Sequence, residues 1–291
     1  MMGSNWLARL ADVVFGAHPA GPPQGRPQVM GIVNVTPDSF SDGGRHDTVA
    51  AAVDHALILL DQGADVLDIG GESTRPGADP VNAAEEIARV VPVIEAIRAE
   101  RPGAGISVDT MKPDVARAAV AAGAAIWNDV TALTHRPESA AVAAELGCDV
   151  ILMHMKGEPR TMQADPRYDD VAAEVRDWLA ARADAAMAAG VARERIWLDP
   201  GIGFGKTAAH NLALTARLDQ LTALGFPVLY AASRKRTIQA VDPTAVDPMD
   251  RLGGSLALAL EGARRGAAMV RVHDVRETVQ ALKIQAAVAG V

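Results

Sequence analysis

The sequence predicts a (β/α)8 barrel, because short apolar segments alternate eight times with segments of helical spacing. The apolar segments are rich in Val, Ile and Leu on both faces, as expected for parallel strands covered by helices. No change of composition interrupts the pattern between residues 28 and 288. We therefore expect one domain over residues 28–291, preceded by an N-terminal extension over residues 1–27. A doubly wound open sheet is the alternative architecture, although such sheets rarely contain eight such even units.

The expected strands and helices follow one another in strict alternation. The strands are expected at residues 29–35, 65–69, 105–108, 125–130, 150–154, 196–198, 227–231 and 268–272. The helices are expected at residues 47–62, 83–99, 113–121, 138–146, 169–189, 211–224, 249–265 and 275–287. In the first helix, Val49, Val53 and Leu60 recur at the spacing of one helical face. Gly63 and Pro113 are residue types typical of a helix end and a helix start.

Composition and charge exclude several classes of protein. The 28 Lys and Arg residues against 36 Asp and Glu give a net charge of −8, which argues against sequence-independent binding of nucleic acid. No apolar run approaches the ~20 residues that cross a bilayer, and the first residues lack the apolar region of a signal peptide. Cys148 is the only cysteine, which excludes an intrachain disulfide and a cysteine-built metal site. We expect a cytoplasmic protein without a membrane partner.

Polar side chains follow the expected strands at the point where each strand ends. The active sites of (β/α)8 barrels lie at this end, in the loops after the strands. These positions are occupied by Asn34, Asp68, Glu72, Asp109, Asn128, Asp129, His154, Asp199, Ser233, Arg234, Lys235, Arg271, His273 and Asp274. Because burying polar groups costs free energy, a barrel that served only stability would not concentrate them here. The sequence therefore predicts an active site.

Residues 198–206, with the sequence LDPGIGFGK, combine a strand-end carboxylate with a glycine-rich turn. The glycines after Asp199 allow the backbone to turn tightly and to approach a flat ligand closely. Lys206 ends the run, but the spacing is not that of a phosphate-binding P-loop. We interpret the segment as a hydrogen-bonding site for a planar, donor-rich ring. An ordinary strand-to-helix turn that carries an aspartate is the alternative.

The candidate site contains both acceptors and cations. Three side chains could form hydrogen bonds with the edge of a heterocycle that carries an amino group and a ring N–H. They are Asp109, Asn128 and Asp199. Charge-assisted bonds to phosphate are strong, so a cluster of cations suits a phosphate or diphosphate, although surface salt bridges are the alternative. The candidate cations are Arg75, Lys235, Arg271 and His273.

Two further residues suggest a metal ion and a lid. Asn34 could hold Mg²⁺ through its side-chain carbonyl, because this ion keeps several waters and needs few protein ligands. Phe40 lies in a polar loop and could cover a bound ligand. A loop side chain folded back on the barrel rim is the alternative for Phe40.

The same segments resemble those of dihydropteroate synthases, from about residue 29 to residue 288. The matching motifs are MGIVNVTPDSFSDGG at residues 30–44, DIGGESTRPG at 68–77, SVDT at 107–110, ND at 128–129, LMHM at 152–155, the run at 199–206, SRK at 233–235 and RVHD at 271–274. The resemblance implies a single pterin-binding (β/α)8 barrel. It also implies a transferase that condenses 6-hydroxymethyl-7,8-dihydropterin diphosphate with 4-aminobenzoate, giving 7,8-dihydropteroate and pyrophosphate in folate biosynthesis.

The resemblance assigns roles to residues at the matching positions. Catalytic roles fall on Asp38, Arg75, Asp109, Lys235 and Arg271. The pterin is expected to contact Asp109, Asn128, Met153, Asp199 and Lys235. The diphosphate is expected to contact Asn34, Thr74, Arg75, Arg271 and His273, with Mg²⁺ at Asn34. The aminobenzoate is expected to contact Phe40, Thr74, Pro76, Phe204 and Lys235. The implied mechanism is an SN1-like loss of pyrophosphate, in which cations stabilise the leaving group and carboxylates stabilise the pterin cation.

The resemblance further implies a homodimer, small-molecule substrates as the only other partners, and a target of sulfonamides. Ala231, Arg236 and Gln239 depart from the usual Gly, Ser and Gly of the family. Two alternatives therefore stay open. A pterin-binding methyltransferase domain that serves a corrinoid protein would lack the motifs at residues 73–77 and 233–235. A non-catalytic pterin-binding paralogue is suggested only by the three departures.

Overall fold

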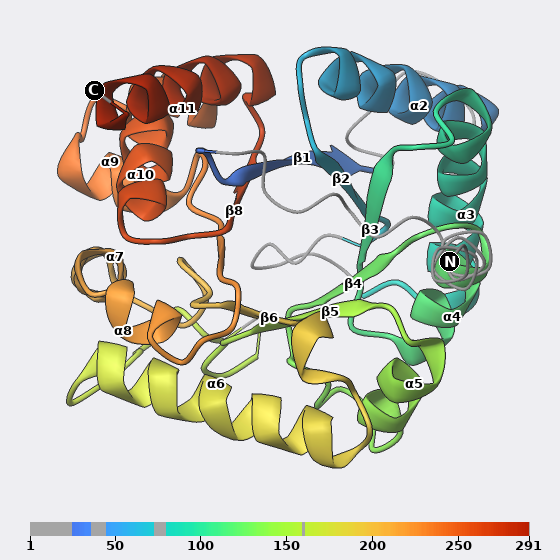
Figure 1. Ribbon diagram of the computed structural model, residues 1–291, viewed down its shortest axis with the longest axis horizontal. Coiled ribbons are helices and arrows are strands. Elements are labelled where there is room, and N and C mark those ends of the chain that lie inside the picture. Colours follow the sequence, from blue (N-terminus) through green and yellow to red (C-terminus); the bar gives the residue numbers. More distant parts are fainter. Residues whose placement is uncertain (1–24, 36–44, 73–79, 159–160, 291) are drawn as a thin grey trace, which may run out of the picture.

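The computed structural model describes residues 25–35, 45–72, 80–158 and 161–290, which form a ring of helices around a sheet of eight parallel strands (Figure 1). The strand order is β6-β5-β4-β3-β2-β1-β8-β7. A parallel bridge between Leu198 and Val228 joins the two ends of this order, and the Leu198 N–H donates to the Pro227 carbonyl at 3.0 Å. The sheet therefore closes, and the predicted (β/α)8 barrel is confirmed.

The elements agree closely with the expected order. The strands are β1 Gln28–Asn34, β2 Val66–Gly70, β3 Gly105–Asp109, β4 Ile126–Asp129, β5 Asp149–Met153, β6 Ile196–Asp199, β7 Leu229–Tyr230 and β8 Met269–Val272. The helices are α2 Arg45–Asp61, α3 Ala83–Glu100, α4 Pro113–Ala121, α5 Ser139–Leu146, α6 Val171–Ala188, α7 Ala208–Ala216, α8 Asp219–Thr222, α9 Arg236–Val241, α10 Leu252–Arg264 and α11 Val275–Ala289, with 3-10 turns η2 Arg193–Arg195 and η3 Pro248–Arg251. No helix of the described ranges is long and apolar enough to cross a membrane.

The single helix expected at residues 211–224 is wrong. Helix α7 begins earlier, because the Thr207 side chain caps it by accepting from the His210 N–H at 3.2 Å. The chain then leaves helical geometry at Arg217 and resumes in the short α8. Leu218 and Leu221 after this break are both buried in the core. Helix α9 and turn η2 were not predicted, since segments this short carry little periodic signal. The helix expected at residues 249–265 begins as the 3-10 turn η3 and continues as α10.

The core has an outer and an inner part, because strand side chains alternate between the helices and the barrel interior. The inner part is a small apolar cluster of Met30, Val66, Ile126, Ile151, Trp197, Leu229 and Met269. Two residues further along the strands, on the same face, the interior becomes polar at Asp68, Asn128, Asp199 and Arg271. The polar layer therefore lies directly above an apolar plug, at the C-terminal end of the barrel.

Candidate active site

Strand register places polar residues of β1, β3 and β4 in one row, with a glycine of β2 between them. Asn34 lies beside Gly70, Gly70 beside Asp109, and Asp109 beside Asn128. Gly70 leaves room in this row: a Cβ at that position would lie 3.6 Å from the Asp109 Cβ and 3.9 Å from the Asn34 Oδ1. A glycine between them thus lets the Asn34 amide and the Asp109 carboxylate face each other across β2.

Arg271 ties this row to the last strand. Its Nε donates to Asp68 Oδ2 at 2.6 Å, and its Nη2 donates to Asp109 Oδ2 at 2.9 Å. The Asn128 Nδ2 donates to the same Asp68 oxygen at 3.1 Å. Asp68 is fully buried, and the sequence-based assignment gave it no contact with substrate. The geometry makes it the residue that orients both Arg271 and Asn128.

Two buried polar atoms in the barrel interior have no partner among the described residues. They are Asp68 Oδ1 and Ser107 Oγ, on strand positions that lie directly opposite each other. Leaving such groups unsatisfied costs roughly 1–3 kcal/mol each, so sites that keep them usually offer them to a ligand or an ordered water. Sequence reasoning missed Ser107, since a small hydroxyl inside an apolar strand carries no distinct signal.

Burial moves the pKa values of Asp109 and Lys235 toward neutral pH. Burial raises the pKa of Asp109 to about 7, with Arg271 lowering it and Asp68 raising it further. Burial also raises the pKa of Asp199, which Lys235 opposes. Burial lowers the pKa of Lys235 to about 8, and Asp199 opposes that shift. Clustered groups with such shifted pKa values are characteristic of functional sites.

The glycine-rich run brings Asp199, Phe204 and Lys235 together. The Asp199 Oδ1 accepts from the Gly201 N–H at 2.7 Å. Gly201 has a φ of 65°, and a Cβ there would lie 1.9 Å from the His154 carbonyl oxygen. The Lys235 Nζ donates to the Ile202 carbonyl and lies 4.7 Å from the centre of the Phe204 ring. Only glycine therefore allows the turn that holds these three side chains in one place.

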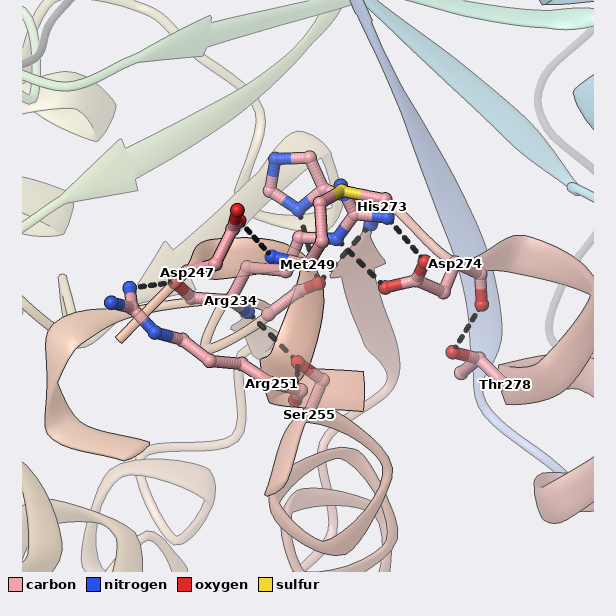
Figure 2. Close-up of polar contacts among 9 residues, drawn as sticks. Arg234, Asp247, Met249, Arg251, Ser255, His273, Asp274 and Thr278 are labelled. Carbon is pink, nitrogen blue, oxygen red and sulfur yellow. Dashed lines mark hydrogen bonds and ion pairs between the residues drawn. The ribbon is translucent and has the colours of Figure 1, made fainter. Parts of the chain in front are cut away.

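Figure 2 shows how the segment after β7 is held against the loop after β8. Arg234 adopts a left-handed backbone conformation with a φ of 57°. Its side chain turns to Asp274, with 3.0 Å between Nε and Oδ2, and its N–H donates to Ser255 Oγ at 2.9 Å. The Arg251 Nη1 donates to the Arg234 carbonyl at 2.9 Å. These contacts fix Arg234 between Ser233, which bonds the His273 Nδ1 at 3.0 Å, and the site residue Lys235.

The three departures from the family pattern have different surroundings. The Gln239 Oε1 accepts from Arg251 Nη2 at 2.9 Å, and Arg251 is buried with no carboxylate bonded to it among the described residues. Gln239 thus supports the scaffold of the segment 234–251. Ala231 is buried at the end of β7, and Arg236 is exposed at the start of α9.

Three of the strand-end residues contact their own loop or neighbouring elements. Asp129 accepts from the Thr131 N–H at 2.7 Å and from the Leu133 N–H at 2.9 Å, which shapes its own loop. Glu72 accepts from Lys112 Nζ at 2.5 Å, and His154 contacts the buried Lys206. A polar strand end therefore predicted a local role, but not whether that role is substrate binding.

The expected site residues fall into a described and an undescribed group. Asn34, Asp109, Asn128, Asp199, Lys235 and Arg271 lie together at one end of the barrel, with Met153 beside Asp199 in the strand register. Asp38, Phe40, Thr74, Arg75 and Pro76 lie outside the described residues, as does the proposed lid. The assigned roles therefore remain predictions.

The fold and the site define the class of protein. A (β/α)8 barrel with a floor of carboxylates and an amide, and with cations beside them, fits an enzyme that binds a planar, amino-bearing ring together with an anionic group. The model of the family described as pterin binding enzyme matches residues 30–273.

Known relatives identify the particular family. The Escherichia coli K12 dihydropteroate synthase is 50% identical over 258 residues, covering 89% of this chain and 90% of that protein. The Xanthomonas albilineans dihydropteroate synthase with 4-aminobenzoic acid superimposes with a TM-score of 0.85 and 53% identity, covering 91% of this chain and 94% of that one. The same organism's enzyme in complex with 7,8-dihydropteroate superimposes with a TM-score of 0.82 and 50% identity, covering 91% of this chain and 95% of that one. A Yersinia pestis dihydropteroate synthase with a sulfonamide drug complex superimposes with a TM-score of 0.85 and 46% identity, covering the same shares of the two chains. The chain belongs to the dihydropteroate synthases of the pterin-binding enzyme family.

Proposed function

We propose that this transferase condenses 6-hydroxymethyl-7,8-dihydropterin diphosphate with 4-aminobenzoate, releasing pyrophosphate and forming 7,8-dihydropteroate. One observation carries the proposal: Asp68, Asp109, Asn128 and Arg271 form a single bonded layer above the apolar plug of the barrel. Asp199 and Lys235 complete this layer from the glycine-rich side. The combination offers acceptors for ring N–H groups and cations for the diphosphate.

The pterin is proposed to lie on the polar layer. Asp109 and Asp199 accept hydrogen bonds from its amino group and ring N–H groups, and Asn128 both donates and accepts. Because Asn128 and Asp109 are already held by Asp68 and Arg271, they need not reorder on binding. Met153 packs against a face of the ring.

The diphosphate is proposed to face Arg271, His273 and Asn34, with Thr74 and Arg75 from the segment 73–77. In the described part of the chain no group of three or more His, Cys, Asp or Glu could hold a metal ion. The Asn34 amide oxygen lies beside Gly70, as does the Asp109 carboxylate, and a single amide oxygen fits Mg²⁺, which uses few protein ligands and completes its shell with water and phosphate. Bound there, Mg²⁺ would neutralise charge on the departing diphosphate.

The proposed reaction breaks the bond between the pterin methylene carbon and the diphosphate oxygen. Arg271 stabilises the charge that develops on the leaving group, while Asp109 and Asp199 stabilise the pterin cation. The amine of 4-aminobenzoate then attacks the methylene carbon, and its proton passes to solvent. Phe204 and Lys235 are proposed to shape the aminobenzoate site together with Phe40, Thr74 and Pro76, while Asp38 and Arg75 complete the catalytic set.

We also propose that residues 28–291 form one domain and that the protein acts as a cytoplasmic homodimer. Exposed apolar side chains on the late part of the chain support a dimer. They are Val241 on α9, Val246 in the loop before η3, Met249 on η3, and Ile284 and Val288 on α11. Light scattering on the purified protein would measure the assembly, and a monomer at micromolar concentration would contradict it.

The test of the reaction is product formation by the purified protein with Mg²⁺ and both substrates. We expect dihydropteroate and pyrophosphate in equal amounts, and little of either when one substrate is omitted. Binding of the pterin diphosphate without any product would favour the non-catalytic paralogue. Transfer of a methyl group from a reduced pterin to a corrinoid protein would favour the methyltransferase.

A further inference from the structure

The loop of residues 201–205 directs each of its carbonyl groups at a side-chain donor. Lys206 Nζ donates to Gly201 O at 3.0 Å and to Phe204 O at 2.9 Å. The other three carbonyls accept from Lys235, from Gln163 and, at 2.9 Å, from the Tyr168 hydroxyl. Lys206 thus holds both ends of the loop, while the remaining donors come from distant parts of the chain.

The Lys206 ammonium is a buried cation held by neutral groups. The side chain is 3% exposed, and its Nζ also lies 2.9 Å from His154 Nδ1 and 3.2 Å from the His154 carbonyl oxygen. Burial lowers the pKa of Lys206 to about 7, and the charge of Asp199 opposes the shift. An ammonium has three donors and no acceptor, so the three carbonyl oxygens around Nζ, which can only accept, favour the protonated form. Lys206 therefore joins the end of β5 to the loop after β6.

Three groups of the proposed substrate site depend on this loop. Asp199 accepts from the N–H of Gly201, the first loop residue. Phe204 lies on the loop itself and beneath the Lys235 ammonium. The Ile202 carbonyl is an acceptor for Lys235. A shift of the loop would therefore move a pterin acceptor, an aromatic wall and a cation at the same time.

We propose that Lys206 is a positioning residue: its buried ammonium fixes the 201–205 loop, and through it the geometry of Asp199, Phe204 and Lys235. The identity of the substrates in this inference rests on the proposed function, whereas the loop contacts do not. The charged and titratable groups that face Lys206 are His154 and Lys156 after β5, Asp199 from β6 and Lys235 after β7. Among them Asp199 carries the one negative charge.

The experiment compares Lys206→Met with Lys156→Met as a matched control. Lys156 lies in the same region but is 47% exposed and sits over the Tyr168 ring. For Lys206→Met we expect kcat/KM for both substrates to fall about tenfold to a hundredfold, the effect of one charge-assisted hydrogen bond. Most of the fall should lie in KM, because substrate-site geometry is lost. The control should keep the wild-type constants.

Two readouts separate positioning from simple stabilisation. Amide hydrogen exchange of residues 201–206 should speed up in Lys206→Met and stay unchanged in Lys156→Met. The second readout is KM itself, which loss of positioning should raise and which simple destabilisation of the fold should leave at its wild-type value. A lower melting temperature with unchanged KM and unchanged loop exchange would overturn the inference.

If Lys206→Met does not fold, Lys206→Gln takes its place, because glutamine keeps two N–H donors without the charge. An unchanged KM and an unchanged loop exchange in Lys206→Gln would equally overturn the inference. If the wild-type protein forms no dihydropteroate, the proposed function fails. In that case loop exchange and calorimetric binding of the pterin diphosphate still decide the role of Lys206.

Discussion

Replacing Arg271 by Met should lower the free energy of unfolding, because the carboxylates of Asp68 and Asp109 would lose their shared positive partner. Asp68 is fully buried, and the Asp109 side chain is 15% exposed. Removing one partner of a buried ion pair costs roughly 3–5 kcal/mol, since an uncompensated charge stays behind. We expect a loss of that size at pH 8 in urea unfolding followed by tryptophan fluorescence. Arg117→Met breaks an exposed pair with Glu145 and should change almost nothing.

The dependence on pH gives this prediction its sign. Arg271 lowers the pKa of Asp109, which is about 7 in the wild type, so this pKa should be higher in the variant. The penalty exists while both carboxylates are ionised, so it should grow as the pH rises through and above 7 and should shrink as the pH falls. The double variant Asp68→Asn with Arg271→Met should recover about 1 kcal/mol or more relative to the single variant. A loss at pH 8 no larger than that of Arg117→Met would refute the reasoning.

Arg271 should also matter beyond the diphosphate. A purely phosphate-binding arginine would, when replaced, weaken binding of the pterin diphosphate and leave the bare pterin unaffected. Because Arg271 holds Asp109 directly, and Asn128 through Asp68, we expect calorimetry to show weaker binding of both ligands. Unchanged binding of the bare pterin to Arg271→Met would show that the polar layer keeps its geometry without the cation.

The remaining predictions concern pH, the glycine turn and the order of binding. A plot of kcat/KM for the pterin diphosphate against pH should be bell-shaped. It should fall below pH ~7 as Asp109 takes up a proton and above pH ~8 as Lys235 loses one. Asp109→Asn should remove the acid limb. Gly201→Ala should abolish folding or activity, because its Cβ would overlap the His154 carbonyl. In Gly253→Ala the new Cβ meets nothing within 4 Å in helix α10, so this variant should be more stable by roughly 0.5–1 kcal/mol. Similar unfolding curves for the two variants would contradict the packing argument. Calorimetry should show 4-aminobenzoate binding only after the pterin diphosphate, and tight binding to the free enzyme would mean a preformed site.

The sequence by itself determined the architecture and the end of the barrel that carries the site. Eight alternations of apolar and helical segments left few folds, and parallel strands place their C-terminal ends at one edge. The strands and helices could be predicted because the apolar spacing that indicates each of them involves residues close together in the chain. Prediction failed where elements are short, as for α9, or where a cap and the core decide the break, as between α7 and α8.

Only the tertiary structure decided which polar strand ends share one site. Asp68 and Arg271 are 203 residues apart, and their bond exists because barrel closure brings β2 and β8 to either side of β1. Asp129 has a similar strand-end position yet faces its own loop. From the sequence, Lys206 was interpreted only as the end of a glycine-rich run, whereas in the structure it is buried at the centre of the loop contacts. Direction and burial of a side chain depend on packing between distant segments, and no local pattern in the chain encodes them.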